Sequence, residues 1–311
     1  MLRSVSKNIN KILKIFGIQI HRAQRTNARA GNKLSDVMIA GYRLKVNNLN
    51  PLKTYYDSHP NYNSELKRVA KIIQKKYPQS GIIDIGANIG DTLAIIMSEV
   101  KTEFICIEGD RDVFDILKTN SAQFEKVKII NQYLGEFEEE FEAEIAKKGW
   151  NSTIKKFDAN SKEKVVIKIK TLDNLLAKEE NINNFKLLKV DTEGYDVKII
   201  RGAQSYLKSV KPVICMEYNR DNMAAIGEDG LSTLFLLEAI GYDKILIYES
   251  EGRLILSTSL REKKLIEDLH EYIDGRKSTI YYFDFCIFHE CDSELAIDFI
   301  NSEKMLRRGN E

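Results

Sequence analysis

Hydrophobic and polar residues change their spacing several times along this chain of 311 residues. In residues 2–20, apolar residues recur every three or four positions with lysine and arginine opposite them, which predicts a short basic amphipathic helix. Residues 37–46 follow as a strand or a hairpin. From Ser64, apolar residues again recur at helical spacing until Pro78, and this pattern predicts a second amphipathic helix.

Beyond that helix, short apolar runs alternate with helical patterns. The runs predict strands at 81–86, 103–108, 126–130, 165–169, 186–190, 212–217, 243–249 and 279–288. The intervening patterns predict helices at 92–100, 113–120, 172–176, 197–207 and 231–240. Strands that alternate with helices imply crossover connections and a mostly parallel sheet covered on both faces. We therefore expect an α/β class, a doubly wound Rossmann-like sheet with an N-terminal helical extension.

Residues 131–164 interrupt this alternation, and we interpret them as an irregular, charged insertion. Within it, the six glutamates of 136–144 are typical of a solvated helix face. The domain organisation that we predict is an N-terminal helix with a linker or hairpin in residues 1–60, one domain in residues 61–300 and a tail in residues 301–311.

The charges are unevenly distributed. The chain has 47 Lys and Arg against 46 Asp and Glu, a formal net charge of +1, but residues 1–35 hold eight of the bases and no acid. The basic helix of residues 2–20 can dock on its own domain or on a partner, or it can lie on an anionic membrane surface. No apolar run is long enough to span a membrane. We therefore expect a soluble, cytoplasmic protein, peripheral on the inner face of the membrane if the leader binds lipid.

The segment that carries most chemical information joins the predicted strand at 81–86 to the helix after it. Asp84 stands near the end of the strand, and Gly86 and Gly90 let the backbone turn sharply and approach a ligand. Asn88 stands where a dinucleotide-binding loop of the pattern G-x-G-x-x-G needs its second glycine. Together with Asp84, which would repel a diphosphate and suits an amino group, Asn88 disfavours the alternative of a nicotinamide-dependent oxidoreductase.

Glu108 ends the next strand, 24 residues after Asp84. A carboxylate at this position can accept hydrogen bonds from both hydroxyls of a ribose. An acid, a glycine loop and a second acid together fit a nucleoside with an amino acid tail, which describes S-adenosylmethionine. The residues predicted to bind it are Asp84, Gly86, Ala87, Asn88, Gly90, Asp91, Thr92, Glu108, Gly109 and Asp191.

Three further acids, Asp191, Glu193 and Glu217, follow two later strands and should reach the same edge of the sheet. Methyl transfer to a hydroxyl needs a base that removes its proton, and each of the three could act as the catalytic base. They could instead hold Mg²⁺, which takes oxygen ligands. A structural alternative is that Asp191 caps the following helix and that Glu193 orders the loop.

The motifs DIGANIGDT, CIEGD, TLDNLL, LLKVDTEGYDVKIIRGA and PVICMEYN occur in this order between residues 60 and 290. In this respect the sequence resembles the FkbM family of methyltransferases. The resemblance implies a seven-stranded class I fold and methyl transfer from S-adenosylmethionine to hydroxyls of sugars, glycans or natural products. It places Asp84, Gly86, Asn88, Gly90 and Glu108 along the cofactor and Asp191 near the methyl group.

We therefore expect an O-methyltransferase whose acceptor is a sugar hydroxyl of a glycan, of a lipid-linked saccharide or of a natural product. A second alternative is a non-catalytic, membrane-associated scaffold that binds S-adenosylmethionine. A nucleic-acid partner is disfavoured, because the chain outside the leader is acidic and lacks interleaved aromatic and basic residues.

Overall fold

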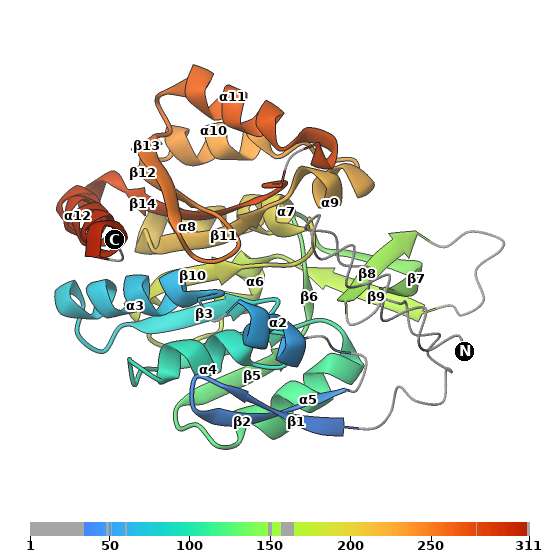
Figure 1. The fold of residues 1–311 in the computed structure, drawn as a ribbon. Coiled ribbons are helices and arrows are strands. Elements are labelled where there is room, and N and C mark those ends of the chain that lie inside the picture. The colour runs from blue at the N-terminus through green and yellow to red at the C-terminus, as the bar shows by residue number, and fades with distance from the viewer. Residues whose placement is uncertain are drawn as a thin grey trace, which may run out of the picture.

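An eight-stranded sheet forms the centre of the fold in the computed structural model (Figure 1). The structure describes residues 34–47, 50, 52–59, 61–148, 151–156, 165–277 and 279–309, so the predicted basic helix at 2–20 lies outside the described residues. In spatial order the strands are β13 (Leu254–Ser259), β12 (Tyr242–Tyr248), β14 (Phe283–His289), β11 (Val213–Tyr218), β10 (Phe185–Val190), β3 (Gly81–Ile85), β4 (Phe104–Glu108) and β5 (Val127–Asn131).

The sheet is parallel from β11 through β10, β3 and β4 to β5, and β14, β12 and β13 pair antiparallel at the other end. This confirms the doubly wound α/β prediction. The resemblance implied seven strands, and β13 is the eighth. It is present because the chain turns back after β12 and pairs with it along the edge of the sheet.

Helices cover both faces of the sheet (Figure 1). Apolar residues on both sides of the central strands form two cores, as expected for parallel strands buried on two faces. One core contacts α6 (Leu172–Leu176), α7 (Asp196–Arg201), α8 (Gln204–Val210), α10 (Leu231–Ala239) and α11 (Lys263–Tyr272). The other contacts α3 (Ser64–Lys76), α4 (Asp91–Met97), α5 (Arg111–Ser121) and α12 (Ser293–Gly309).

A hairpin formed by β1 (Leu34–Ile39) and β2 (Tyr42–Asn47) precedes the short helix α2 (Leu52–Ser58) and confirms the prediction for residues 37–46. Its apolar side packs on α4, as Val37, Leu44 and Ile95 share one cluster. Asn120 of α5 donates to the carbonyl oxygens of Lys45 (2.9 Å) and Ile89 (2.8 Å). The hairpin is thus tied to the loop that follows β3.

The prediction for residues 131–164 was wrong, because this segment contains β6 (Tyr133–Leu134), β7 (Glu139–Lys148) and β8 (Asn151–Lys156). These strands form a four-stranded sheet with β9 (Val165–Lys170), which was expected in the central sheet (Figure 1). The glutamates lie on a strand instead of a helix. Glu140 and Glu142 are exposed while Phe141 and Ala143 turn inward, the period of two that defines a half-buried strand.

Two other helices differ from their predictions. The helix expected at 197–207 is divided into α7 and α8 around Gly202, where a side chain could not fit: a Cβ atom there would lie 2.1 Å from the carbonyl oxygen of Gly135. Residues 301–309, assigned to a tail, continue α12, and Glu303 pairs with Arg68 of α3 at 2.6 Å. Between β11 and α10 lies α9 (Arg220–Ala225). Within the described ranges, no helix is long and apolar enough to cross a membrane.

Candidate active site

Strand register aligns a row of polar residues across one face of the sheet, at the carboxyl ends of the parallel strands. Lys189 of β10 stands beside Asp84 of β3, and Glu217 of β11 lies opposite Asp284 of β14. Asp284 in turn lies opposite Tyr248 of β12. Because side chains alternate between the two faces of a sheet, these residues share the face that α3 covers. Asp284 and Tyr248 were not predicted as site residues.

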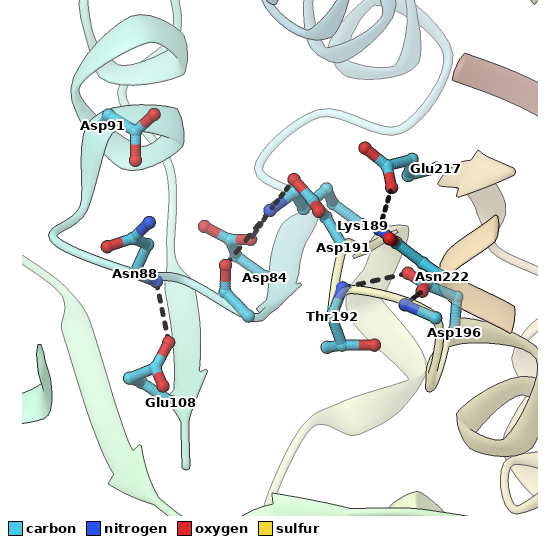
Figure 2. A network of polar contacts seen from close by, with 12 residues as sticks. Asp84, Asn88, Asp91, Glu108, Lys189, Asp191, Thr192, Asp196, Glu217 and Asn222 are labelled. Atoms are coloured by element: carbon cyan, nitrogen blue, oxygen red, sulfur yellow. Dashed lines mark hydrogen bonds and ion pairs between the residues drawn. The ribbon is translucent and has the colours of Figure 1, made fainter. Parts of the chain in front are cut away.

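Lys189 is the buried centre of this row (Figure 2). Its ammonium nitrogen lies 3.2 Å from Asp84 Oδ1 and 3.4 Å from Asp191 Oδ2, and it donates to the carbonyl oxygen of Gly86 at 3.3 Å. Burial lowers the pKa of Lys189, but the charges of Asp84, Asp191 and Asp91 outweigh that effect and raise it above its ordinary value. Sequence reasoning missed this residue, although a lysine inside an apolar strand end was a usable signal.

Asp84 has a different partner from the one suggested by the sequence. Its side chain is fully buried and faces Lys189, where we expected it to be open to the amino group of a ligand. Burial raises the pKa of Asp84, and the nearby Lys189 offsets part of this effect. The 3.2 Å contact with Lys189 gives this buried carboxylate a counter-charge. Asp84 therefore positions Lys189 in this structure.

The loop after β3 has the backbone that its glycines suggested. Gly86, Asn88 and Gly90 all have positive φ angles, of 72°, 46° and 88°. The amide groups of Gly86 and Ala87 donate to the carbonyl oxygen of Ile107, which holds the loop against β4. A Cβ atom on Gly86 would lie 1.8 Å from the carbonyl oxygen of Asp191, so only glycine allows the loops after β3 and β10 to meet.

Glu108 closes the other side of this loop (Figure 2). Its carboxylate accepts from the amide of Asn88 at 3.0 Å and from the amide of Asp110 at 2.8 Å. Burial raises the pKa of Glu108 to about 7, although these two hydrogen bonds favour the charged form. Beside it, the ring of Tyr133 lies against Gly109, where a Cβ atom would be 2.1 Å from the ring.

The other predicted loop residues point inward. Ala87 belongs to the core on the α3 face, and Thr92 is buried in the first turn of α4. Asp91 is also buried, and it accepts a hydrogen bond from the Tyr56 hydroxyl at 3.0 Å. These three side chains are therefore packed inside the protein and support the loop from within.

The loop after β10 is shaped by Asp196, which accepts from the amides of Thr192 (3.1 Å) and Gly194 (3.0 Å). Asp191 therefore does not supply these backbone contacts, and its side chain stays 37% exposed at the strand end. Glu193 has a positive φ of 54°, and its carboxylate accepts from Asn222 at 2.8 Å.

Asn222, which the sequence did not indicate, also donates to Glu217 at 3.4 Å (Figure 2). It therefore links Glu217 to Glu193. Burial, followed by the charges of Asp191 and Glu193, raises the pKa of Glu217 well above its ordinary value. A carboxyl group with a raised pKa is a stronger base when ionised. Glu217 thus combines basicity with a place next to Asp191.

No group of three or more His, Cys, Asp or Glu side chains in the described part of the chain is arranged to hold a metal ion. The three acids proposed as a Mg²⁺ site thus do not converge on one point. Two buried hydroxyl groups near the loops do lack a hydrogen-bond partner, namely Tyr133 Oη beside Gly109 and Thr192 Oγ1 beside Gly86. Hydroxyl and amino groups of a nucleoside with an amino acid tail fit these atoms.

A doubly wound sheet with an acid, a glycine loop and a second acid at its carboxyl edge defines the protein as a Rossmann-like, class I methyltransferase. The sequence profile of the methyltransferase FkbM domain matches residues 84–244, which is more than half of the chain. The chain belongs to the FkbM methyltransferase family, as the resemblance implied. No curated protein sequence matches it.

Several solved structures are similar to the chain at low sequence identity. Methyltransferase FkbM from Methylobacillus flagellatus KT is 15% identical with a TM-score of 0.40, and the match covers 58% of this chain and 43% of that one. The METTL16 MTase domain is 11% identical with a TM-score of 0.39, over 72% and 64%. P. horikoshii TYW2 in complex with MeSAdo is 13% identical with a TM-score of 0.42, over 90% and 82%. The chain thus spans less than two thirds of the first two proteins.

Proposed function

We propose that the protein transfers the methyl group of S-adenosylmethionine to a hydroxyl group, on a sugar of a glycan, of a lipid-linked saccharide or of a natural product. Family membership supports the methyl transfer itself. The observation that carries the hydroxyl acceptor is the position of Glu217, a half-buried carboxyl group of raised pKa that lines the same cavity as Asp191. Transfer to oxygen needs such a proton acceptor.

The cofactor supplies a methyl group that its sulfonium already activates, so the protein has to position the acceptor and take its proton. Glu108 would accept the ribose hydroxyls, since each of its oxygens has a lone pair left beside its one backbone bond. Tyr133 Oη and Thr192 Oγ1 would complete their missing hydrogen bonds on the cofactor. The backbone of Gly86 and Asn88 leaves room for a close approach.

Among the three candidate bases, the contacts favour Glu217. The Asp191 carboxylate lies 3.4 Å from the Lys189 ammonium and is therefore already paired with a cation. Glu193 accepts a 2.8 Å hydrogen bond from Asn222. Glu217 has only a longer contact, 3.4 Å, with the same amide. We therefore assign the proton transfer to Glu217 and the orientation of the acceptor to Asp191 and Glu193.

Calorimetric titration with S-adenosylmethionine tests the cofactor site. The variant Glu108→Ala should weaken binding about tenfold or more, by the loss of charge-assisted hydrogen bonds. The matched control is Glu103→Ala, an exposed glutamate just before the other end of β4, which should bind as the unchanged protein does. Equal affinity in both variants would refute the site.

Turnover is tested with S-adenosylmethionine labelled in its methyl group and with glycans from cells that lack the protein. These glycans should be one CH₂ unit lighter than those of unmodified cells, and the purified protein should restore the unit on oxygen. Glu217→Gln should reduce kcat by roughly 10²–10⁴ while cofactor affinity stays the same. Cofactor binding without any transfer would instead favour a non-catalytic scaffold.

A further inference from the structure

A cavity opens at the carboxyl edge of the sheet, between its β10, β11, β14 and β12 strands and the start of α3. Its empty volume, open solvent included, is about 400 Å³. Apolar side chains such as Leu66, Val69 and Phe299 contribute to its lining, and four carboxylates, those of Glu65, Asp191, Glu217 and Asp284, share it. Only Glu217 and Asp191 have a part in the proposed chemistry, so the other two acids need an explanation.

Two buried polar atoms of cavity-lining residues have no hydrogen-bond partner. They are Glu65 Oε2, on a residue that is 5% exposed, and Tyr248 Oη, on a residue that is fully buried. The nearest guanidinium, that of Arg68, is directed to other acceptors: it donates to Glu303, Ser64 and the carbonyl oxygen of Gly252. A buried polar group without a partner is costly, and its position on a cavity wall indicates a ligand that completes the bond.

The lining of the cavity is negatively charged. Lys189 is the one basic residue on its described walls, and the ammonium of Lys189 already contacts Asp84 and Asp191. Burial raises the pKa of Glu65 to about 7, and the charge of Arg68 offsets only part of this effect. Burial and then the charge of Glu65 raise the pKa of Asp284. A ligand cation between Glu65 and Asp284 would keep both ionised, whereas an anion would be repelled.

Tyrosines complete the surroundings of these acids. Tyr62 packs edge-on against Tyr55 at 4.7 Å between ring centroids and against Tyr56 at 5.5 Å. After burial, the charges of Asp191 and Asp284 are among the causes that raise the pKa of Tyr62, so this ring lies near the acids. Aromatic rings combined with carboxylates recognise ammonium groups, because both present negative charge to the cation.

We propose that the acceptor carries an ammonium group close to the hydroxyl that is methylated, and that Glu65, Asp284 and Tyr248 bind this ammonium. The acceptor class is then an amino alcohol such as an amino sugar with a free amine. This inference rests on the proposed function, because Glu217, the proposed base, lies directly opposite Asp284 in the antiparallel pair. The three N–H donors of an ammonium match the unpartnered oxygens of Glu65 and Tyr248 and the carboxylate of Asp284.

The position of these groups separates them from the cofactor. Glu108 and the glycine loop follow β4 and β3, whereas Asp284 and Tyr248 belong to β14 and β12, beyond β10 and β11 in the sheet. The ribose that Glu108 would bind therefore lies at the other end of the polar row, away from Glu65 and Tyr248.

The test uses the full chain, saturated with S-adenosylhomocysteine, and three methyl hexosides of the same ring configuration. They bear a free amine, an N-acetyl group or a carboxylate, and their binding is measured by saturation-transfer NMR and calorimetry. The amino sugar should bind at least about tenfold more tightly than the N-acetyl sugar, because hydrogen bonds that involve a charged group are stronger. The sugar with the carboxylate should bind most weakly. Glu65→Gln and Tyr248→Phe should each reduce this preference, and Glu103→Gln, at the exposed residue before β4, should keep it.

Tyr248→Phe removes only a hydroxyl, so it tests the site even if Glu65→Gln fails to fold. Equal binding of the amine and the N-acetyl sugar, or no binding of any of the three at tens of millimolar, would overturn the inference. That result is also expected if an ordered water alone completes the bonds of Glu65 and Tyr248. Methylation of a neutral hydroxyl without an amine preference refutes this inference alone. An amine preference without methyl transfer from S-adenosylmethionine refutes the proposed function and leaves the amine site standing.

Discussion

Removal of the Lys189 ammonium should destabilise the fold more than neutralisation of the Asp84 carboxylate. Asp84 is fully buried and, among the described residues, pairs with the Lys189 ammonium at 3.2 Å, so Lys189→Met leaves a buried carboxylate without this counter-charge. In Asp84→Asn, by contrast, Lys189 keeps the Asp191 carboxylate at 3.4 Å and the Gly86 carbonyl oxygen at 3.3 Å. The two substitutions are therefore not equivalent, although they break the same ion pair.

The distances determine how much stability each substitution should cost. Unit charges 3.2 Å apart attract by about 5 kcal/mol at an effective dielectric constant near 20, and desolvation offsets much of this attraction. Loss of one partner from a buried pair typically costs about 3–5 kcal/mol, which we expect for Lys189→Met at neutral pH. Asp84→Asn should cost about 1–2 kcal/mol, the worth of one charge-assisted contact. The double variant should be more stable than Lys189→Met alone, since it contains no buried carboxylate at position 84.

Urea denaturation of the four proteins measures these free energies of unfolding, and a constant m-value shows that the unfolding transition is comparable. The stability that Lys189→Met loses relative to the unchanged protein should also become smaller as the pH falls. The pKa of Asp84 is already raised by burial, so protonation of this acid in the folded state restores stability at low pH. Additive costs in the double variant, or a cost below about 1 kcal/mol for Lys189→Met, would show that this pair does not stabilise the site.

Three further predictions concern the other features of the chain. The carboxyl pKa of Glu65, raised from 4.5 to about 7, means that the fold loses about 3 kcal/mol of stability as the pH rises through that interval. Glu65→Gln should remove this loss in urea titrations from pH 4.5 to 8, and parallel pH profiles would contradict the assignment. Gly86→Ala should destabilise by about 3 kcal/mol or more in thermal unfolding, because its Cβ clashes with Asp191, whereas Gly41→Ala, with a similar φ and open space, should cost about 1 kcal/mol. We also propose that the basic leader binds anionic membranes, so deletion of residues 1–25 should abolish salt-sensitive sedimentation with anionic liposomes, and unchanged sedimentation would refute this.

The sequence predicted the central sheet well because burial on both faces leaves a strong pattern. Apolar strands flanked by helical periods have few alternative folds, and the strands expected at 81–86 and 186–190 are β3 and β10. The prediction failed in residues 131–164, where charge dominated the interpretation. Glu140 and Glu142 are exposed on a strand, but the alternation with Phe141 and Ala143 covers too few residues to outweigh a run of glutamates.

The candidate site could be predicted only where its residues belong to local motifs. Gly86 is recognisable because a glycine lets the backbone turn sharply, and Asn88 because it replaces the second glycine of the dinucleotide-binding pattern; both have a positive φ. Lys189, Asp284 and Tyr248 are single polar residues in apolar strands, and nothing local shows that they face one another. Their relation depends on strand register, which joins residues as far apart as Asp84 and Lys189 only after the sheet has formed.

Lys189 also explains why the acids on its two sides can differ in function. Its charge is shared by Asp84 on the β3 side and by Asp191 at its own strand end, so these carboxylates are neutralised without a ligand. Glu217 and Asp284, on the next two strands, receive no such contact, and burial raises the pKa of both. The carboxylates on the side of the glycine loop are therefore held in place by Lys189. Those that line the cavity need a positively charged ligand. An acceptor with an ammonium group would supply the missing positive charge, and its hydroxyl would lie next to Glu217, the proposed base. The strand register that builds the cofactor site therefore also determines which acceptor fits.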